Sequence, residues 1–221
     1  MNRRILWLFP VLALALLAGC NFPPKPLTED ELDQCNEAFQ PMVVEDGVGD
    51  STEISCFFTS FYNSPEELDL EAFLAYFPGS LSETVTDEDT EEFAALMALM
   101  GDGLTAQKPS DLPWPTHRIP REVVDRVLSE HAGITTADLK DTGGVLYLEE
   151  YDAFYNFTSD FGPGAFVCED VERANDSVRL WSAPLYVPGT DETAGRAVLI
   201  LQKAGDTWFI QSFQLLDGEI N

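Results

Sequence analysis

The spacing of apolar side chains changes near residue 144. Before that point, apolar residues recur every three or four positions, as on one face of a helix. After it, they tend to alternate with polar residues, as on the two faces of a β-strand. Because the helical patterns come first and the strand patterns follow, the sequence predicts an α+β fold and not the alternating helices and strands of the α/β class.

Four helices are predicted in the first half, and each is bounded by recognisable residues. Most begin with a Ser, Thr or Pro followed by acidic residues, and they end near Pro or Gly. Gly133, for example, stands where a left-handed residue commonly ends a helix. The predicted helices cover residues 28–39, 65–77, 86–100 and 120–132.

Six strands are predicted in the second half, and together they favour an antiparallel meander on which the helical half packs. The segment Ala197–Leu201 is apolar at every position, as in a central strand. Trp208, Ile210 and Phe213 of the closing pair resemble the last hairpin of cone-shaped, nuclear-transport-factor-like α+β folds, which is the alternative architecture. The predicted strands cover residues 145–149, 153–158, 165–169, 177–186, 196–203 and 207–215.

The N-terminus combines a basic start with a short apolar run. Arg3 and Arg4 precede the apolar segment 5–18, which is shorter than the roughly 20 residues that cross a bilayer. The run ends in Leu17-Ala18-Gly19-Cys20, which resembles the lipobox of bacterial lipoproteins. This resemblance implies cleavage between Gly19 and Cys20 and lipidation of the Cys20 thiol, and two acyl chains hold a protein stably on a membrane.

The predicted organisation follows from this lipobox. Residues 1–19 are expected to be a signal peptide, residues 20–27 a lipidated cysteine with a Pro-rich tether, and residues 28–221 a single extracytoplasmic domain. The tether contains Pro23, Pro24 and Pro26, which favour an extended chain. We therefore expect a protein of the cell envelope that contacts the bilayer through acyl chains, such as palmitate, on Cys20.

The charge is strongly negative. The chain has 12 Lys and Arg against 39 Asp and Glu, a formal net charge of -27. Such a surface repels phosphates, so the composition excludes a nucleic-acid-binding protein of the ordinary basic kind. It also repels anionic head groups, so the lipid on Cys20 is the expected membrane contact. The hydrophobic fraction of 45% is typical of a packed globular domain.

Two further segments carry a second resemblance. Residues 55–62 with Pro65–Leu68, and residues 147–162, resemble a group of uncharacterised lipoproteins from Gram-positive gut bacteria. The likeness also includes Thr28–Phe39. The group has no assigned activity, so the resemblance implies a location and a fold and transfers no function.

The sequence offers few candidates for catalysis or metal binding. His117 and His131 are the only histidines, and neither stands in a zinc-binding motif, so no metal site and no cofactor are predicted. The glycine-rich segment 101–106 follows a helix instead of a strand and is interpreted as a loop. The acidic run 86–92 is interpreted as the first turn of a helix, with calcium binding as the alternative.

The three cysteines after Cys20 are predicted to be small buried side chains. Cys35 lies on the apolar face of a predicted helix, and Cys56 stands beside two phenylalanines. With Cys168 they make an odd number, which favours reduced thiols. A disulfide between Cys35 and Cys56 is the alternative, because an exported protein meets an oxidising compartment.

Aromatic and polar residues alternate densely between residues 147 and 166. Such a segment is typical of a sheet core, but it could also line a groove for a carbohydrate or peptide. Tyr151, Tyr155 and Trp181 are the candidate ligand surface. The sequence thus favours a binding or interaction module for protein or glycan. The alternatives are an extracytoplasmic enzyme or small-ligand binder, with a cleft around His117 or His131, and an acidic cation-binding surface protein.

Overall fold

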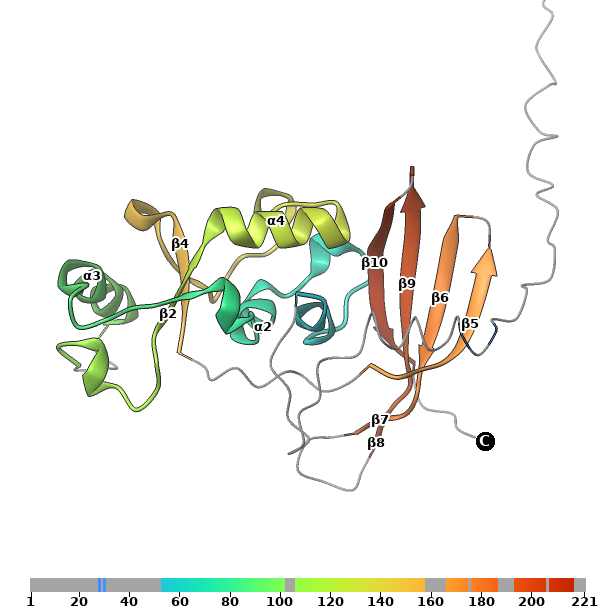
Figure 1. Ribbon diagram of the computed structural model, residues 1–221, viewed down its shortest axis with the longest axis horizontal. Coiled ribbons are helices and arrows are strands. Elements are labelled where there is room, and N and C mark those ends of the chain that lie inside the picture. Colours follow the sequence, from blue (N-terminus) through green and yellow to red (C-terminus); the bar gives the residue numbers. More distant parts are fainter. Residues whose placement is uncertain are drawn as a thin grey trace, which may run out of the picture.

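The computed structural model describes residues 53–101, 106–157, 166–174, 176–186, 193–205 and 207–216, together with Thr28 and Asp30 (Figure 1). The signal peptide, Gly19 and Cys20, the tether and most of the predicted helix 28–39 lie outside the described residues. The expectations for those segments therefore stay predictions. Among the described residues, no helix is both long enough and apolar enough to cross a membrane.

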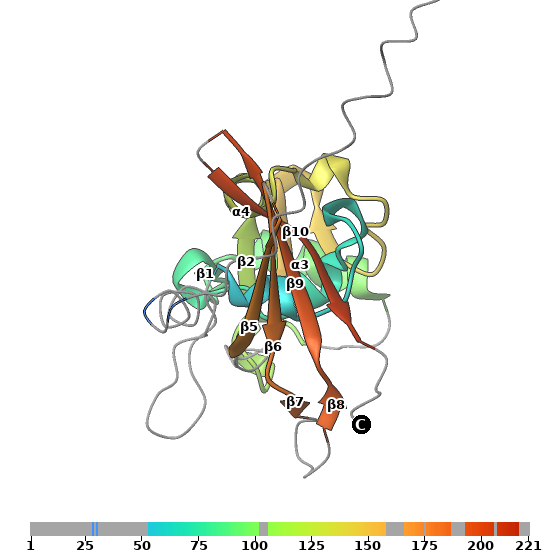
Figure 2. The same cartoon turned by 90° about the vertical axis from the view of Figure 1, so that its right-hand side faces the viewer.

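Two four-stranded antiparallel sheets lie at opposite ends of the long axis (Figure 1). One has the strand order β10-β9-β6-β5, and its four strands lie side by side in the view of Figure 2. The other has the strand order β1-β2-β4-β3. A two-stranded sheet, β7 with β8, extends below the first. The strands are β1 (Glu83–Thr84), β2 (His117–Pro120), β3 (Leu146–Leu148), β4 (Ala153–Asn156), β5 (Cys168–Ala174), β6 (Ser177–Ser182), β7 (Leu185–Tyr186), β8 (Thr193–Gly195), β9 (Ala197–Ala204) and β10 (Thr207–Leu215).

The helices lie mainly between the two four-stranded sheets and beside the β1–β2–β4–β3 sheet (Figure 1). The α-helices are α2 (Leu70–Ala75), α3 (Thr90–Met100) and α4 (Arg121–Ala132). Short 3-10 helices connect them: η1 (Ser55–Phe58), η2 (Pro65–Glu67), η3 (Gly79–Leu81), η5 (Pro109–Asp111), η6 (Thr136–Asp138) and η7 (Glu149–Tyr151). The mixed α+β class is therefore confirmed.

Several predicted elements agree closely with the structure. Strand β10 occupies the predicted residues 207–215, and α4 matches the predicted helix 120–132 to within one residue. Gly133 ends α4 with a φ of +71°, in the left-handed region. In β9, Leu199 and Leu201 belong to the core while Val198 and Ile200 point to the opposite face, which fits a central strand.

The helical first half and the single meander are not confirmed. Strands β1 and β2 lie within the segment that was expected to be helical, and β2 pairs with β4 in a sheet separate from β5–β10. The β2 segment is only four residues long, too short to display a period of two, and the residue before Pro120 favours an extended backbone. Strand pairing over such distances leaves no trace in local spacing.

Three predicted boundaries also move, each for a local reason. The expected helix 65–77 divides into η2 and α2, because Leu68 is extended and Asp69 caps a new helix by accepting a hydrogen bond from the Ala72 N–H at 3.0 Å. Helix α3 begins at Thr90, four residues later than expected. Strand β5 runs from 168 to 174 and not from 165 to 169, and the expected strand 177–186 divides into β6 and β7.

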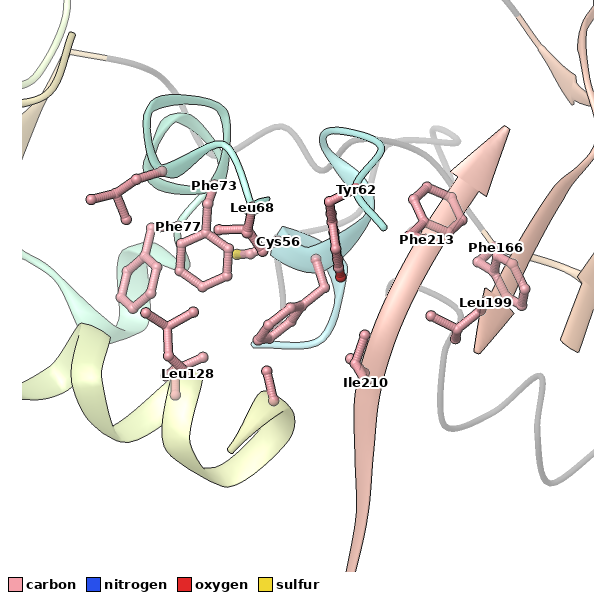
Figure 3. Packing of buried hydrophobic residues seen from close by; sticks show 14 of the residues in the cluster. Cys56, Tyr62, Leu68, Phe73, Phe77, Leu128, Phe166, Leu199, Ile210 and Phe213 are labelled. Carbon is pink, nitrogen blue, oxygen red and sulfur yellow. The ribbon is translucent and has the colours of Figure 1, made fainter. Parts of the chain in front are cut away.

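The larger core cluster joins the β5–β10 sheet to the helices (Figure 3). The ring centroids of Phe57 in η1 and Phe73 in α2 are 5.1 Å apart, and those of Phe58 and Phe213 in β10 are 5.2 Å apart. Tyr62 and Phe213 exchange two backbone hydrogen bonds of 2.8 and 3.1 Å. The segment 55–62 therefore links the helices to the sheet.

A second, smaller cluster holds α3 against the β1–β2–β4–β3 sheet. Its buried members are Val85, Phe93, Leu96, Ala153 and Tyr155. Because side chains alternate along β4, Ala153 and Tyr155 face this cluster while Phe154 faces the larger one. Both faces of β4 are thus covered.

Candidate functional site

The predicted aromatic surface is not assembled as expected. Tyr155 is only 3% exposed and donates a hydrogen bond from its hydroxyl to Glu92 Oε1 at 2.6 Å. Tyr151 is half-buried against the same cluster, and Trp181 is half-buried in β6 of the other sheet. Tyr155 is almost fully buried and reaches the surface only at the depression between α2 and the β3–β4 hairpin, so the three aromatic residues do not form one exposed patch, and their part in ligand binding stays a prediction.

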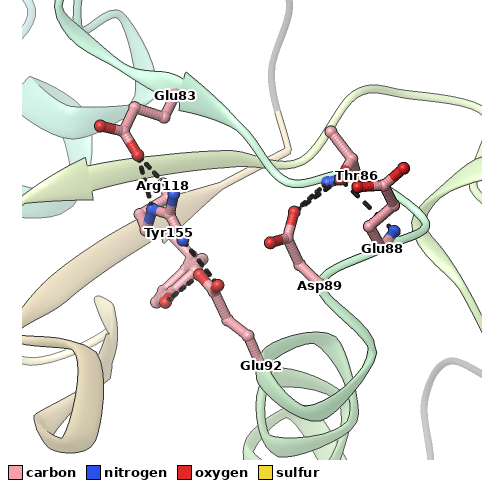
Figure 4. A network of polar contacts seen from close by, with 7 residues as sticks. All are labelled: Glu83, Thr86, Glu88, Asp89, Glu92, Arg118 and Tyr155. Atoms are coloured by element: carbon pink, nitrogen blue, oxygen red, sulfur yellow. Dashed lines mark hydrogen bonds and ion pairs between the residues drawn. The ribbon is translucent and has the colours of Figure 1, made fainter.

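The Tyr155 hydroxyl belongs to a network of polar groups that extends from the buried Glu92 to the exposed Glu83 (Figure 4). Arg118 Nη1 donates to Glu92 Oε2 at 2.7 Å, and Arg118 Nε donates to Glu83 Oε2 at 3.0 Å. Burial and the hydrogen bond to Glu92 raise the pKa of Tyr155 well above its usual value. The network connects α3, β1, β2 and β4, so it holds the smaller cluster together.

The two histidines have different polar neighbours. His117 Nδ1 lies 3.2 Å from Ser82 Oγ, and no described carboxylate is bonded to this imidazole. His131, in the last turn of α4, lies 3.2 Å from Glu53 Oε2 and contacts the edge of Phe57. Neither histidine lines any of the depressions described below.

Glu53, Glu130 and His131 form a cluster that the sequence did not indicate. Their ligand atoms lie within 4.8 Å of one another, as they would around a divalent cation. Arg126, however, donates to Glu53 Oε1 at 2.9 Å and to Glu130 Oε2 at 3.0 Å. Burial alone would raise the pKa of the Glu53 carboxyl, but hydrogen bonds and attraction from Arg126 and His131 lower it overall. A guanidinium thus already balances both carboxylates.

The two described cysteines are buried, as predicted. Cys56 Sγ lies 3.2 Å from the Tyr76 carbonyl oxygen, and Cys168 Sγ lies 3.5 Å from that of Asp170. Cys35 lies outside the described residues, so the two alternatives for its pairing stay predictions.

Three depressions on the described surface are large enough to consider as binding sites. One of about 170 Å³ lies between α2 and the β3–β4 hairpin, and includes Asn156. One of about 320 Å³ is lined mainly by acidic residues and backbone around the start of α2. The third, of about 340 Å³, lies between residues 84–87 and 109–116, at the end of the molecule farthest from the β5–β10 sheet (Figure 1). We call it the Trp114 groove.

An exposed indole distinguishes the Trp114 groove. Trp114 is 56% exposed, the largest exposed fraction among the large apolar side chains that the structure describes. Pro109, Pro113 and Pro115 line the groove around it. Ligand pockets are concave and lined mainly by apolar and aromatic side chains, so an exposed indole at a groove marks a candidate binding site.

The walls of the groove are fixed to each other by polar contacts. Asp87 Oδ1 accepts from the Ser110 N–H at 3.0 Å, and Oδ2 accepts from the Ser110 hydroxyl at 2.8 Å and from Lys108 Nζ at 3.0 Å. These hydrogen bonds lower the pKa of the Asp87 carboxyl. At the base of the groove, the Val85 N–H donates to the Thr116 carbonyl at 2.8 Å.

Three carboxylates of the acidic run 86–92, those of Asp87, Asp89 and Glu92, have specific partners. Asp89 Oδ2 accepts from the Thr86 N–H and hydroxyl, both at 2.7 Å, which closes the turn before α3. Glu92 is in the buried network and Asp87 is in the groove wall. The interpretation of this run as a single helical first turn was therefore too simple, because only its second half is helical.

One polar atom at the groove has no partner. Thr116 is 1% exposed, and its hydroxyl makes no hydrogen bond with the described residues. Sequence reasoning missed both Thr116 and Trp114, because segment 109–116 has neither helical nor strand spacing. The only available signal was a tryptophan between two prolines, which marks a loop and not a site.

Comparison with known proteins finds no matching family model, no matching curated protein and no matching solved structure. The cone-shaped alternative architecture therefore stays a prediction, and the geometry of the described residues is the basis for a function.

Proposed function

We propose that the protein is an exported lipoprotein, anchored in the cell envelope by acyl chains on Cys20, whose extracytoplasmic domain binds a protein or a glycan. The lipobox Leu17–Cys20 after a short apolar run supports the anchor. The Pro-rich tether supports a domain held away from the bilayer. The net charge of -27 supports a membrane contact made by lipid alone.

The observation that carries the binding function is the 56% exposed Trp114 beside a groove with fixed walls. Burying apolar area stabilises a complex by about 25 cal/mol per Å², and aromatic side chains bring the largest areas. Binding also needs less ordering of the protein when the site is already formed. Asp87 fixes the two walls of the groove before a ligand binds, because its carboxylate accepts hydrogen bonds from both Ser110 and Lys108.

Two other functions have one supporting observation each. An enzyme is supported by the Ser82–His117 contact, which brings a hydroxyl to an imidazole but adds no carboxylate. An acidic cation-binding protein is supported by the Glu53–Glu130–His131 cluster, where Arg126 occupies the position between the carboxylates. Neither lies at a described depression, so the Trp114 groove is the stronger candidate.

The binding function is tested by comparing the Trp114→Ala and Trp208→Ala variants of the full chain, solubilised in detergent, on an array of glycans and peptides. Trp208 is a matched control because it is an exposed tryptophan in β10, on the other sheet. We expect ligands that are retained by wild type and by Trp208→Ala and lost by Trp114→Ala. An array with no Trp114-dependent ligand would reject the groove as the binding site.

The anchor is tested by labelling cells with palmitate. We expect label in the wild-type chain and none in Cys20→Ala. Label that persists in Cys20→Ala would show that lipid is attached elsewhere, without affecting the conclusion about the groove.

A further inference from the structure

We infer that the Trp114 groove binds a neutral saccharide, by stacking a sugar ring on the Trp114 indole and bonding its hydroxyls to the polar groups of the groove. This inference rests on the proposed binding function and names the class of ligand. Three properties of the groove support it: its apolar surface, the kind of hydrogen-bonding groups that line it, and its charge.

The apolar part of the groove matches the face of a sugar ring. The Trp114 indole and the side chains of Pro109, Pro113 and Pro115 present C–H groups and an aromatic surface. A pyranose has C–H groups on its faces and hydroxyls around its edge. A ring stacked on the indole therefore buries apolar area and leaves its hydroxyls free to reach the groove walls.

The polar part of the groove offers few free backbone donors. Proline has no N–H, and several other backbone N–H groups of the walls are already used, including those of Val85 and Ser110. The polar side chains that remain are mainly hydroxyls, together with the indole N–H, since the Asp87 carboxylate already accepts three hydrogen bonds. Because hydroxyls both donate and accept, the groove suits a ligand that does the same. Sugar hydroxyls do so, whereas a proline-rich peptide offers mainly carbonyl acceptors.

The charge of the groove disfavours acidic ligands. Asp87 is its one charged lining residue, and the neighbouring Lys108 is paired with Asp87 at 3.0 Å. The chain as a whole carries a net charge of -27. A uronic acid or a phosphorylated sugar would meet repulsion without a compensating cation, so the preferred saccharide is neutral.

Thr116 supplies a hydrogen-bonding position that the protein leaves unused. Its side chain is 1% exposed, and buried polar atoms ordinarily have a partner. A hydroxyl can donate or accept, and so can a sugar hydroxyl. A saccharide hydroxyl at the base of the groove would give Thr116 its partner after a small shift of the side chains that cover this atom.

The experiment is calorimetric titration of the full chain in detergent with cellotriose, maltotriose and chitotriose, with trigalacturonic acid as the anionic counterpart. We expect at least one neutral trisaccharide to bind about tenfold more tightly than trigalacturonic acid. Trp114→Ala should weaken that binding about thirtyfold, as for the loss of a central aromatic contact, while Trp208→Ala leaves it unchanged.

Thr116→Val separates a binding role from a structural one. Valine has a similar shape and lacks the hydroxyl, so we expect saccharide binding to weaken about threefold to tenfold while the melting temperature does not fall. Thr116→Ser, which keeps the hydroxyl, should bind like wild type. If Thr116→Val lowers the melting temperature and leaves binding unchanged, the role of this hydroxyl in saccharide binding is refuted.

A decaproline peptide and an oligolysine peptide separate the failure of the inference from that of the proposed function. If a peptide binds in a Trp114-dependent manner and no neutral saccharide does, the saccharide inference is overturned and the binding function stands. If saccharides bind equally well to Trp114→Ala, both the saccharide inference and the groove as the binding site fail. If nothing in the panel binds, the saccharide inference fails.

Discussion

Removing the Glu92 carboxylate is the sharpest test of how the smaller cluster is held together. Glu92 lies in the first turn of α3 and is 4% exposed. It accepts hydrogen bonds from Tyr155 at 2.6 Å and from Arg118 at 2.7 Å. Glu92→Ala would leave a buried phenol and one arm of a guanidinium without an acceptor.

The expected loss can be worked out from these contacts. Removing one partner of a buried ion pair costs about 3–5 kcal/mol in unfolding free energy when the other charge is left unpaired. Arg118 keeps Glu83 and is partly exposed, so we expect Glu92→Ala to cost about 3 kcal/mol, at the lower end of that range. Glu92→Gln keeps an oxygen for Tyr155 and loses the charge, so we expect about 1.5–3 kcal/mol. Glu83 bonds the same arginine but is 58% exposed, and Glu83→Gln should cost about 0–1 kcal/mol.

Urea unfolding of the full chain and its variants measures these differences, from the midpoint and the slope of the transition. The loss should be largest for Glu92→Ala, smaller for Glu92→Gln and smallest for Glu83→Gln. Equal losses for Glu92→Ala and Glu83→Gln would refute the reasoning, since burial would then make no difference. In a double-mutant cycle, Glu92→Ala and Tyr155→Phe should couple by about 0.5–3 kcal/mol, because each variant removes their hydrogen bond.

Three further variants test other parts of the fold. Hydrogen bonds from Arg121 and Tyr147 lower the pKa of Asp152 to about 2. This carboxylate therefore stabilises the fold fully above about pH 4, and its contribution is lost as the pH falls through 2. Asp152→Asn should flatten that part of the curve of stability against pH, measured by urea midpoints. Gly133→Ala should lower the unfolding free energy by about 1–2 kcal/mol through its φ of +71°, and calorimetry should show a smaller loss for Gly133→Asn. Leu199→Ala should cost about 2–5 kcal/mol in urea unfolding, and Ile200→Ala, on the opposite face of β9, clearly less.

Local signals predicted those parts of the fold that local interactions determine. Helix α4 has an apolar face and ends at a glycine, and both features can be read from neighbouring residues. Strand β10 is nine residues long and rich in aromatic and β-branched residues, so it can be recognised although a register shift between Ile210 and Ser212 interrupts its alternation. Strands β1 and β2 have two and four residues and exist because they pair with each other and with β4, which no local pattern encodes.

The candidate site was harder to predict, because its residues are brought together by tertiary contacts. Asp87 and Ser110 are 23 positions apart, and Glu53 and His131 are 78 apart. Tyr155 shows a different limit: its segment was correctly interpreted as a strand, but spacing does not reveal whether a second layer covers the strand. Here α3 supplies that layer and buries the phenol.

The polar network around Glu92 and the Trp114 groove are connected through the paired strands β1 and β2. Glu83 and Arg118 are directly paired across β1 and β2, and the groove walls continue from these two strands, with Val85 bonded to Thr116. At the far end Asp87 bonds Ser110. The groove is therefore held at its base by the Val85–Thr116 hydrogen bond, which continues from the paired Glu83 and Arg118, and at its rim by Asp87. Since both ends are fixed within the protein itself, a ligand meets a preformed surface, and its affinity depends on the indole and the hydroxyls and little on ordering the loop.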